Sequence, residues 1–197
     1  MSMPARRAAV FLDRDGTLNR ELAGALSAPT ELELLPGALE GAAALCAAGF
    51  ALVVATNQSA IARGWVAPHQ VSEVHRALAQ RMADAGAELA GIFICPHHPA
   101  EGAAPYRRAC TCRKPAPGLI LRAVRELDLE LSGSWVVGDA ERDLAAGSAL
   151  GLPGVLVLTG KGQGELERLQ REGRAPAHVA EDLRAAAQLV LAAGQGR

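Results

Sequence analysis

Short apolar runs alternate along this 197-residue chain with longer segments of helical periodicity, which predicts an α/β protein with a mainly parallel sheet. The runs are almost continuously apolar, as expected for strands that helices cover on both faces. Prolines near the starts and glycines at the ends of several helical segments support these boundaries. Half of the residues are apolar but only 3% are aromatic, so alanine, leucine and valine must fill the core.

The predicted elements follow one another in strand–helix order. Strands are expected at residues 8–12, 51–55, 91–94, 135–137 and 155–158. Helices are expected at residues 38–48, 68–85, 117–127, 144–150 and 181–193. The proline-rich stretch 96–117 is irregular, and a loop of this length in a compact domain usually serves a function. The chain is long enough for a sizeable core, and we predict a single domain over residues 1–197.

Composition and charge exclude several classes of function. Lysine and arginine number 20 and aspartate and glutamate 21, a net charge of −1 that argues against binding nucleic acid through bulk positive charge. No apolar run approaches the roughly 18 residues that a membrane span needs, and the run at 8–12 is too short for the core of a signal peptide. We therefore expect a cytoplasmic monomer that acts on a small molecule and binds neither nucleic acid nor membrane.

The most informative motif is Asp13-Arg14-Asp15-Gly16-Thr17, directly after the apolar run at 8–12. The ends of parallel strands are where α/β sheets bind ligands. Two carboxylates there can divide the work of a nucleophile and a proton donor, or they can hold a hard cation such as Mg²⁺. For Asp13 and Asp15 taken alone, the alternative is a solvated acidic turn that merely closes the strand.

Three further polar clusters stand near predicted strand ends, so all four clusters should meet at one edge of the sheet. They are Thr56-Asn57-Gln58-Ser59, Arg113-Lys114-Pro115 and Gly138-Asp139-Ala140-Glu141-Arg142-Asp143. Taken singly, they are compatible with a polar turn, a solvated pair of cations and acidic residues that begin a helix. Taken together, they supply carboxylates, a hydroxyl, amide donors and a lysine, which is the set that phosphoryl transfer requires.

Three cysteines and one histidine stand just before the irregular stretch and within it, in two closely spaced pairs: Cys95 with His97, and Cys110 with Cys112. In a reducing compartment such clustering indicates metal binding more than a disulfide. Three thiolates and one imidazole form a closed tetrahedral set for structural Zn²⁺. His98 is a competing ligand to His97, and four unrelated residues are the alternative interpretation of the cluster.

The remaining cysteine and three of the histidines lack such partners. Cys46 lies in an apolar helical pattern and should be a small core residue. Surface positions are expected for the other histidines, which are His69, His75 and His178.

Four of these motifs resemble those of the haloacid dehalogenase superfamily of phosphatases, over roughly residues 8–160. The matching positions are D-x-D-G-T at 13–17, Thr56, Lys114, and Gly138-Asp139-x-x-x-Asp143. The resemblance implies that Asp13 attacks phosphorus and forms an aspartyl-phosphate, while Asp15 protonates the leaving group and then activates water. It also implies Mg²⁺ held by Asp13, the backbone carbonyl of Asp15 and Asp139, with Thr56 and Lys114 on the phosphoryl oxygens. Because Asp15 must begin protonated to act as an acid, we expect its surroundings to raise its pKa.

The sequence Cys-Pro-His-His-Pro followed by Cys-x-Cys-Arg-Lys-Pro, with Thr-Asn-Gln-Ser upstream, resembles the subgroup of heptose-bisphosphate and histidinol phosphatases. This implies a Rossmann-like domain in which a zinc-binding loop replaces a large cap domain. The implied zinc ligands are Cys95, His97, Cys110 and Cys112. The implied substrate-binding residues are Asn57, Gln58, Ser59, Arg113 and Lys114.

The reaction that the resemblance implies is the Mg²⁺-dependent removal of the 7-phosphate from D-glycero-D-manno-heptose 1,7-bisphosphate. Histidinol phosphate or another small sugar phosphate is the alternative substrate. A catalytically inactive, zinc-bearing interaction module is the alternative of a different class. Four intact residues argue against it: Asp13, Asp15, Lys114 and Asp139. Ala25, Ala60 and Ala140 depart from the residues usual in the subgroup, and all three lie where the sugar should be recognised.

Overall fold

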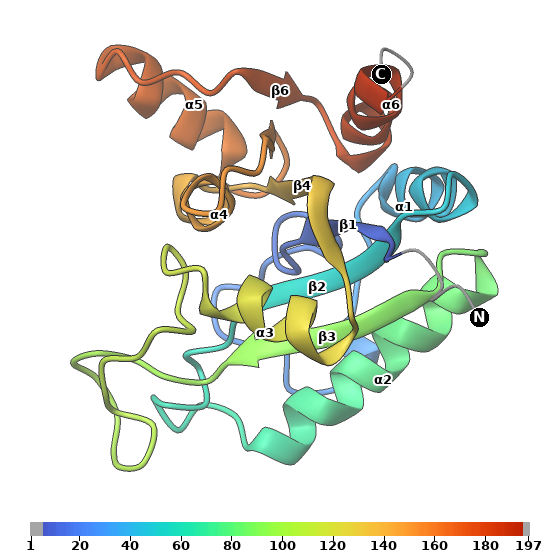
Figure 1. The fold of residues 1–197 in the computed structure, drawn as a ribbon. Helices are drawn as coiled ribbons and strands as arrows, with labels where there is room; N and C mark the ends of the chain where they lie inside the picture. Colours follow the sequence, from blue (N-terminus) through green and yellow to red (C-terminus); the bar gives the residue numbers. More distant parts are fainter. Residues whose placement is uncertain (1–5, 195–197) are drawn as a thin grey trace.

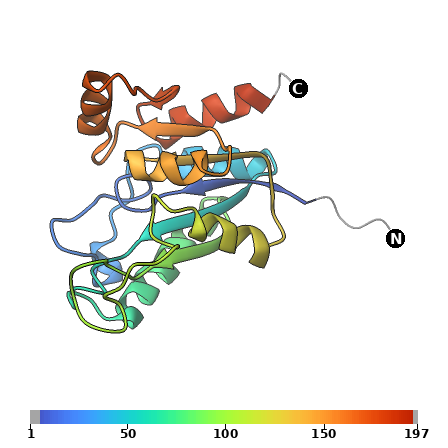
Figure 2. The ribbon, with the colours of Figure 1, turned by 60° about the vertical axis from the view of Figure 1, so that its left-hand side comes forward.

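The computed structural model describes residues 6–194, which form a six-stranded parallel sheet with helices on both faces (Figures 1 and 2). The strands are β1 (Ala8–Leu12), β2 (Ala51–Asn57), β3 (Leu89–Cys95), β4 (Glu130–Gly138), β5 (Gly154–Val157) and β6 (His178–Ala180). The helices are α1 (Ala38–Ala47), α2 (Pro68–Asp84), α3 (Gly118–Glu126), α4 (Glu141–Ser148), α5 (Gly162–Arg171) and α6 (Leu183–Gly194), with a 3₁₀ helix η1 (Pro29–Glu31) before α1. The predicted fold class, a Rossmann-like α/β sheet, is confirmed.

The strand order β3-β2-β1-β4-β5-β6 places β1 in the middle of the sheet. The chain moves outward from β1 through β2 to β3, and then returns to pair β4 with the other side of β1. The loops after β1 and β4 therefore leave in opposite directions and open a crevice at the carboxyl edge, where α/β sheets bind ligands. Asp13 follows β1 and Asp139 follows β4, so the topology brings these two carboxylates to the crevice.

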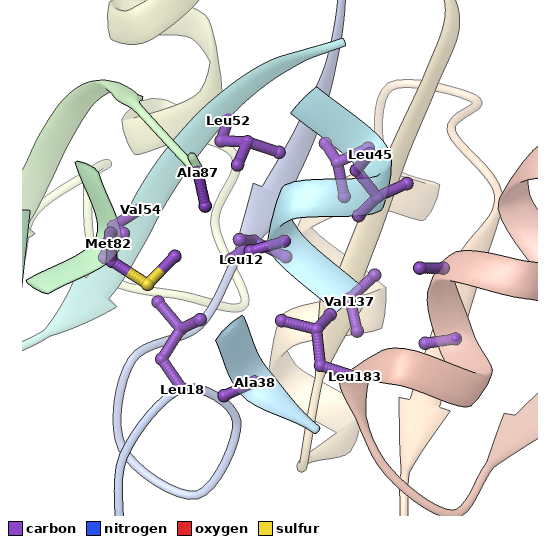
Figure 3. Close-up of a cluster of buried hydrophobic side chains, with 14 of the residues drawn as sticks. Leu12, Leu18, Ala38, Leu45, Leu52, Val54, Met82, Ala87, Val137 and Leu183 are labelled. Atoms are coloured by element: carbon purple, nitrogen blue, oxygen red, sulfur yellow. The ribbon is translucent and has the colours of Figure 1, made fainter. Parts of the chain in front are cut away.

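Alternate residues of β1 enter two separate cores, one on each face of the sheet. Val10 and Leu12 pack with residues of α1, α2 and α6, and Figure 3 shows this first core. Ala9 and Phe11 pack with residues of α3 and α4 on the opposite face. Cys46 packs against the first core, as expected. Because β1 is buried on both faces, it provides a rigid support for the residues that follow it.

The helix α5, the strand β6 and the short helix η1 were not predicted, and β3, β4 and α4 each begin two or more residues earlier than predicted. The sequence of α5, GQGELERLQR, contains only two leucines, too few apolar residues to predict a buried helix. β6 has three residues, too few for a recognisable alternation. α4 begins at Glu141 because Asp143 caps its start, and Asp143 Oδ2 accepts a hydrogen bond from the backbone N–H of Ala140 at 3.1 Å.

The irregular segment lies where the sequence placed it, between the end of β3 at Cys95 and the start of α3 at Gly118. It extends from the carboxyl edge of the sheet, and residues 99–105 are exposed. The part of the chain that the structure describes contains no large cap domain over this edge. Within the same part, none of the helices combines the length and the apolar character that crossing a membrane requires.

Candidate active site

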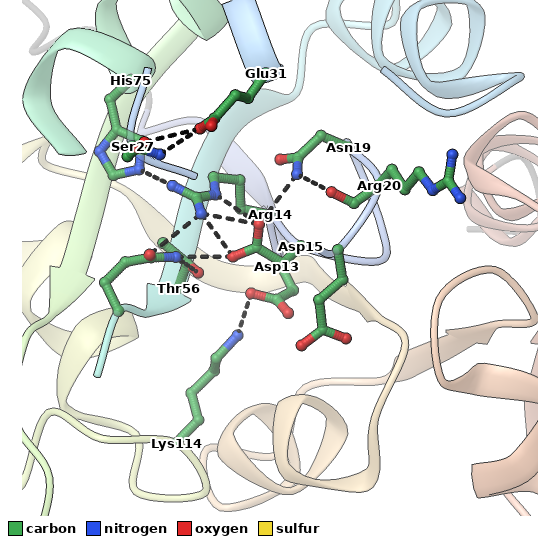
Figure 4. Close-up of polar contacts among 12 residues, drawn as sticks. Asp13, Arg14, Asp15, Asn19, Arg20, Ser27, Glu31, Thr56, His75 and Lys114 are labelled. Atoms are coloured by element: carbon green, nitrogen blue, oxygen red, sulfur yellow. Dashed lines mark hydrogen bonds and ion pairs between the residues drawn. The ribbon is translucent and has the colours of Figure 1, made fainter. Parts of the chain in front are cut away.

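Asp13 stands at the carboxyl end of β1, where its carboxylate is almost completely buried. Its backbone N–H donates a hydrogen bond to the carbonyl of Val137 on β4 at 3.0 Å, so the sheet still holds the residue after the strand ends. Lys114 Nζ donates to Asp13 Oδ1 at 2.8 Å (Figure 4). The predicted nucleophile and the predicted phosphate-binding lysine therefore meet, although 101 residues separate them in the chain.

Lys114 is only 4% exposed and pairs with two carboxylates, Asp13 and, at 2.7 Å, Asp143. Burial alone would lower the pKa of Lys114, but the two negative charges outweigh burial and raise that pKa, so the lysine stays charged. Asn57 forms hydrogen bonds with both backbone polar groups of Lys114, the N–H and the carbonyl. Its side-chain oxygen accepts from the backbone N–H and its amide donates to the carbonyl, both at 3.1 Å. Asn57 thus positions the lysine.

Three buried carboxylates lie together, with one oxygen of each within 4.8 Å of the others: those of Asp13, Asp139 and Asp143. Burial, followed by the charge of Asp13, raises the pKa of Asp139 to about 7. Asp139 Oδ2 accepts a hydrogen bond from the backbone N–H of Lys161 at 2.9 Å, whereas Oδ1 is buried and has no partner among the described residues. This donor set, with its excess of negative charge, suits a hard cation such as Mg²⁺.

Gly16 allows the loop after β1 to approach this carboxylate cluster. Its φ of +85° is in the left-handed region, and a Cβ at this position would collide with the carboxylate of Asp139. The loop itself is tight, because the carbonyl of Arg14 accepts a hydrogen bond from the backbone N–H of Leu18 at 2.8 Å. The glycine of the D-x-D-G-T motif is therefore required by the close contact between the loop and Asp139.

The expectation of a raised pKa for Asp15 is wrong. Burial would raise the pKa, but the charge of Arg14 and hydrogen bonds from three side chains lower it. Arg14 Nη2 lies 2.8 Å from each carboxylate oxygen of Asp15. Asn19 Nδ2 donates to Oδ1 at 3.0 Å and Gln58 Nε2 to Oδ2 at 2.9 Å (Figure 4). Asp15 is therefore held as a carboxylate at neutral pH in this structure.

Arg14 is a buried residue to which the sequence analysis assigned no role, and its partner His75 is not at the surface as expected. Arg14 is 2% exposed, and its Nη1 lies 2.8 Å from His75 Nε2 on α2. A signal for His75 existed, since Val71, His75, Leu78 and Met82 follow one buried face of α2 at helical spacing. No comparable signal existed for Arg14, because its partner is 61 residues away.

A cavity of about 120 Å³ opens beside Asp15 and Arg14. Its wall combines predicted substrate-binding residues with two to which no role was assigned: Asn57, Gln58, Ser59, Arg63 and Trp65. Arg63 Nη1 donates to Ser59 Oγ at 3.0 Å, and the Arg63 guanidinium lies 4.9 Å from the centroid of the Trp65 ring. Gln58 Nε2 also donates to the buried Thr56 Oγ1 at 3.0 Å, so the first and second motifs meet here.

Arg113 is not among the described residues that line this cavity. Its Nη1 donates to the backbone carbonyl of His97 at 3.1 Å, so it braces the irregular loop. Of the three departures noted in the sequence, Ala25 and Ala60 line the cavity, whereas Ala140 is buried at the start of α4.

The four predicted zinc ligands come together where β3 leads into the irregular loop. Each of these residues offers one ligand atom, and the four atoms all lie within 4.8 Å of one another: those of Cys95, His97, Cys110 and Cys112. The Sγ atoms are 3.3 to 3.6 Å apart, well beyond the roughly 2.05 Å of a disulfide and near the roughly 3.8 Å edge of a tetrahedron with zinc–sulfur bonds of about 2.3 Å. His98 is engaged elsewhere, because its Nδ1 accepts the backbone N–H of Glu101 at 2.8 Å. The geometry therefore favours His97 over His98.

Comparison with known proteins agrees with this architecture. The HAD-hydrolase-like family model matches residues 111–186. D-glycero-beta-D-manno-heptose-1,7-bisphosphate 7-phosphatase from Pasteurella multocida is 42% identical over 154 residues, 78% of this chain and 83% of that protein. The Bordetella bronchiseptica protein of the same name is 37% identical over 184 residues, 92% of this chain and 97% of that protein.

A solved structure extends the likeness to the fold. The crystal structure of D,D-heptose 1,7-bisphosphate phosphatase from B. bronchiseptica, complexed with magnesium and phosphate, has a TM-score of 0.81 at 36% identity. The match covers 94% of this chain and 99% of that one.

The fold and the site define a phosphatase of the haloacid dehalogenase class. They combine a central parallel sheet, carboxylates at the crevice between the ends of β1 and β4, and a buried lysine. Within that class, the chain belongs to the heptose-bisphosphate phosphatase family.

Replacing Asp139 with asparagine should stabilise the metal-free protein at pH 8. Since the folded-state pKa of about 7 lies above the ordinary 3.8, the stability linked to this proton is lost as the pH rises through about 7. Asparagine removes the negative charge that Asp13 repels, and its side-chain oxygen can still accept the hydrogen bond from the Lys161 N–H. In EDTA, urea unfolding should show a gain of at most about 4 kcal/mol at pH 8 and little gain near pH 4.

The matched control is Asp84→Asn, at an exposed position on α2, which should leave the unfolding midpoint unchanged. An Asp139→Asn protein that is less stable than the wild type at pH 8 in EDTA would show that the carboxylate is not repelled.

Proposed function

We propose that this protein removes the 7-phosphate of D-glycero-D-manno-heptose 1,7-bisphosphate. The observation that carries the proposal is the buried Asp13–Lys114 pair, which places a nucleophile and a cation at the ligand-binding edge of the sheet. The choice of substrate rests on the names of the relatives that match most of the chain. We further propose a cytoplasmic monomer without nucleic-acid or membrane partners; of these points, the near-neutral net charge bears on nucleic-acid binding, which usually needs excess positive charge.

In the first step, a carboxylate oxygen of Asp13 attacks phosphorus, and the bond between phosphorus and the sugar oxygen breaks. Lys114, beside Asp13, stabilises the charge on the phosphoryl oxygens, and the Thr56 hydroxyl donates a hydrogen bond to them. Mg²⁺, bound by Asp13, Asp139 and the backbone carbonyl of Asp15, would neutralise charge that otherwise keeps two anions apart. Asp143 is an additional candidate ligand.

Asp15 moves the protons in both steps. As an acid it gives its proton to the departing sugar oxygen. As a carboxylate it then takes a proton from the water that attacks the aspartyl-phosphate, which releases inorganic phosphate and restores Asp13. Because Arg14 keeps the resting carboxyl group ionised, the acid form must arise in the substrate complex, where the negative phosphate opposes the charge of Arg14.

The irregular loop and the residues after β2 are proposed to hold the structural metal and to bind the substrate. Zn²⁺ on the cluster Cys95, His97, Cys110 and Cys112 would be structural, because four protein ligands leave no position for water or substrate. Gln58 and Ser59 face the cavity and are proposed to contact the substrate, while Asn57 and Arg113 also fix the loop that delivers Lys114.

The substrate is tested by measuring kcat/KM over a panel of phosphorylated metabolites. The panel should include both anomers of heptose 1,7-bisphosphate and histidinol phosphate. The proposal requires one heptose bisphosphate anomer to exceed histidinol phosphate and simple sugar monophosphates. A preference for histidinol phosphate would assign the other branch of the subgroup, and no phosphate release from any member in the presence of Mg²⁺ would favour an inactive module.

Asp13→Asn should abolish turnover in a protein that remains folded, since an amide is a poor nucleophile and a poorer cation ligand. Asp15→Asn should lower kcat/KM by about 10²–10⁴-fold, the range typical of proton transfer. Phosphate release and circular dichroism measure the two properties, with Asp84→Asn as the exposed control. Retention of most activity by folded Asp13→Asn would refute the aspartyl-phosphate mechanism.

Cys110→Ser should lower zinc content, loop order and catalytic efficiency together. Serine is a weak zinc ligand, and Cys112 stands two residues before Lys114, so a loosened cluster displaces the cation. Metal analysis should find one zinc per wild-type chain and about one per Cys46→Ser control, whose cysteine lies outside the cluster. The loss in kcat/KM should be larger for a sugar bisphosphate than for a small generic ester. Full efficiency in a zinc-free Cys110→Ser protein would contradict this role.

A further inference from the structure

Arg14 is a fully buried cation inside the catalytic motif, and every group of its guanidinium is engaged. Its Nε and Nη2 lie 3.1 and 2.8 Å from Asp15 Oδ1, and Nη2 lies 2.8 Å from Oδ2. Nη2 also donates to Gln58 Oε1 at 3.2 Å, and Nη1 contacts His75 Nε2 at 2.8 Å. A planar guanidinium that is hydrogen-bonded on three sides has little freedom to turn, so it can fix the orientation of the Asp15 carboxylate.

The contact with His75 fixes the direction of the hydrogen bond. Arginine has donors only, so His75 Nε2 must accept and the ring must be neutral, with its proton on Nδ1. Burial, followed by the charge of Arg14, lowers the pKa of His75 to about 4, which agrees with a neutral ring. His75 lies on α2, packed into the first core beside Val74 and Leu78, so this helix anchors the guanidinium from outside the motif.

We propose that Arg14 is a positioning residue for proton transfer: it fixes the carboxyl group of Asp15 toward the leaving oxygen, and His75 on α2 holds Arg14 in place. The inference rests on the proposed function and deepens it. Asp15 remains 22% exposed on the cavity side while its other contacts are taken by Arg14, Asn19 and Gln58. A displacement of about 1 Å in a catalytic group can cost about 10²-fold in rate, so this clamp should matter for the step that needs the proton.

The step that needs the proton can be isolated by the choice of leaving group. A sugar alkoxide leaves only when it is protonated, whereas 4-nitrophenolate leaves as an anion without help from Asp15. kcat/KM reports the steps through formation of the aspartyl-phosphate, in which the leaving group departs. A positioning defect therefore lowers kcat/KM for the sugar bisphosphate much more than for 4-nitrophenyl phosphate, while a general loss of active-site structure lowers both.

The decisive variant is His75→Leu, because His75 is neither in the cavity wall nor in the carboxylate cluster. Leucine removes the acceptor for Arg14 and still fills a buried position on the apolar face of α2. We expect kcat/KM to fall about 10–100-fold for the sugar bisphosphate and less than about 3-fold for 4-nitrophenyl phosphate, with the Mg²⁺ concentration for half-maximal rate unchanged. His75→Gln, which restores an acceptor for Arg14, should recover most of the loss. His69→Leu, at an exposed position on the same helix, should behave as wild type with both substrates.

Arg14 itself is tested by chemical rescue. Arg14→Ala leaves space for a guanidinium ion, and added guanidinium chloride at millimolar concentration should restore sugar-bisphosphate turnover in this variant but not in Asp15→Asn. Arg14→Lys keeps the charge without the planar fork and should show the same selective loss as His75→Leu.

Equal losses on the two substrates, or no loss in His75→Leu, would overturn the inference while leaving the proposed function intact, provided that Asp13→Asn is inactive. An active Asp13→Asn protein would instead remove the proposed function. If Arg14→Ala does not fold, the His75 series decides the question alone.

Discussion

The buried pairing of Lys114 with Asp13 and Asp143 is the interaction on which the rest of the site depends. It joins the end of β1, the end of the irregular loop and the first turn of α4. Burying charges costs free energy, and such groups persist where geometry and partners compensate for the lost water. Burial and then the charge of Asp13 raise the pKa of Asp139 to about 7. The three carboxylates outnumber the neighbouring cations Lys114 and Arg142, so a divalent cation suits this place.

The same lysine makes the irregular loop part of the active site. Most of the loop tip is exposed and contributes little to either core, so its shape depends on fixed points. Cys95 belongs to β3, and the cluster ties it to Cys112, two residues before Lys114. Asn57 at the end of β2 then holds the backbone of Lys114. A metal bound by this cluster would therefore be coupled to the position of Lys114 through the few residues of chain between them, which β2 and β3 anchor.

Local sequence patterns were sufficient to predict β1, most of β2 and the motifs, but not contacts between distant parts of the chain. They recovered only residues 135–137 of β4, because the start of this strand, Glu-Leu-Ser-Gly-Ser, is mostly polar. β1 has the predicted bounds because five apolar residues followed by two aspartates end a strand unambiguously. β6 has only three residues and α5 only two leucines, so neither carries enough apolar residues to be recognised. The middle residue of D-x-D carries no pattern at all, yet the fold turns Arg14 inward beside Asp15. Burial would raise the pKa of Asp15, but the charge of Arg14 and hydrogen bonds from Arg14, Asn19 and Gln58 lower it, opposite to the expected direction. Such a reversal depends on tertiary packing, which spacing rules do not contain.

Recognition of the sugar must depend on the partly exposed residues around the cavity, and not on the buried charged groups that perform the chemistry. Ala25 and Ala60 line the cavity but have no side-chain polar atom to offer a hydroxyl. The charged groups near them are paired but partly exposed: Lys161 with Glu21 at 2.6 Å, and Arg63 with a carboxylate of the irregular loop. Exposed ion pairs contribute only about 0–1 kcal/mol, so a phosphorylated ligand can displace their carboxylates at small cost. The buried pairs at Asp13 have no such freedom. Specificity can therefore vary at the rim through exchangeable ion pairs, while the phosphoryl-transfer centre stays fixed.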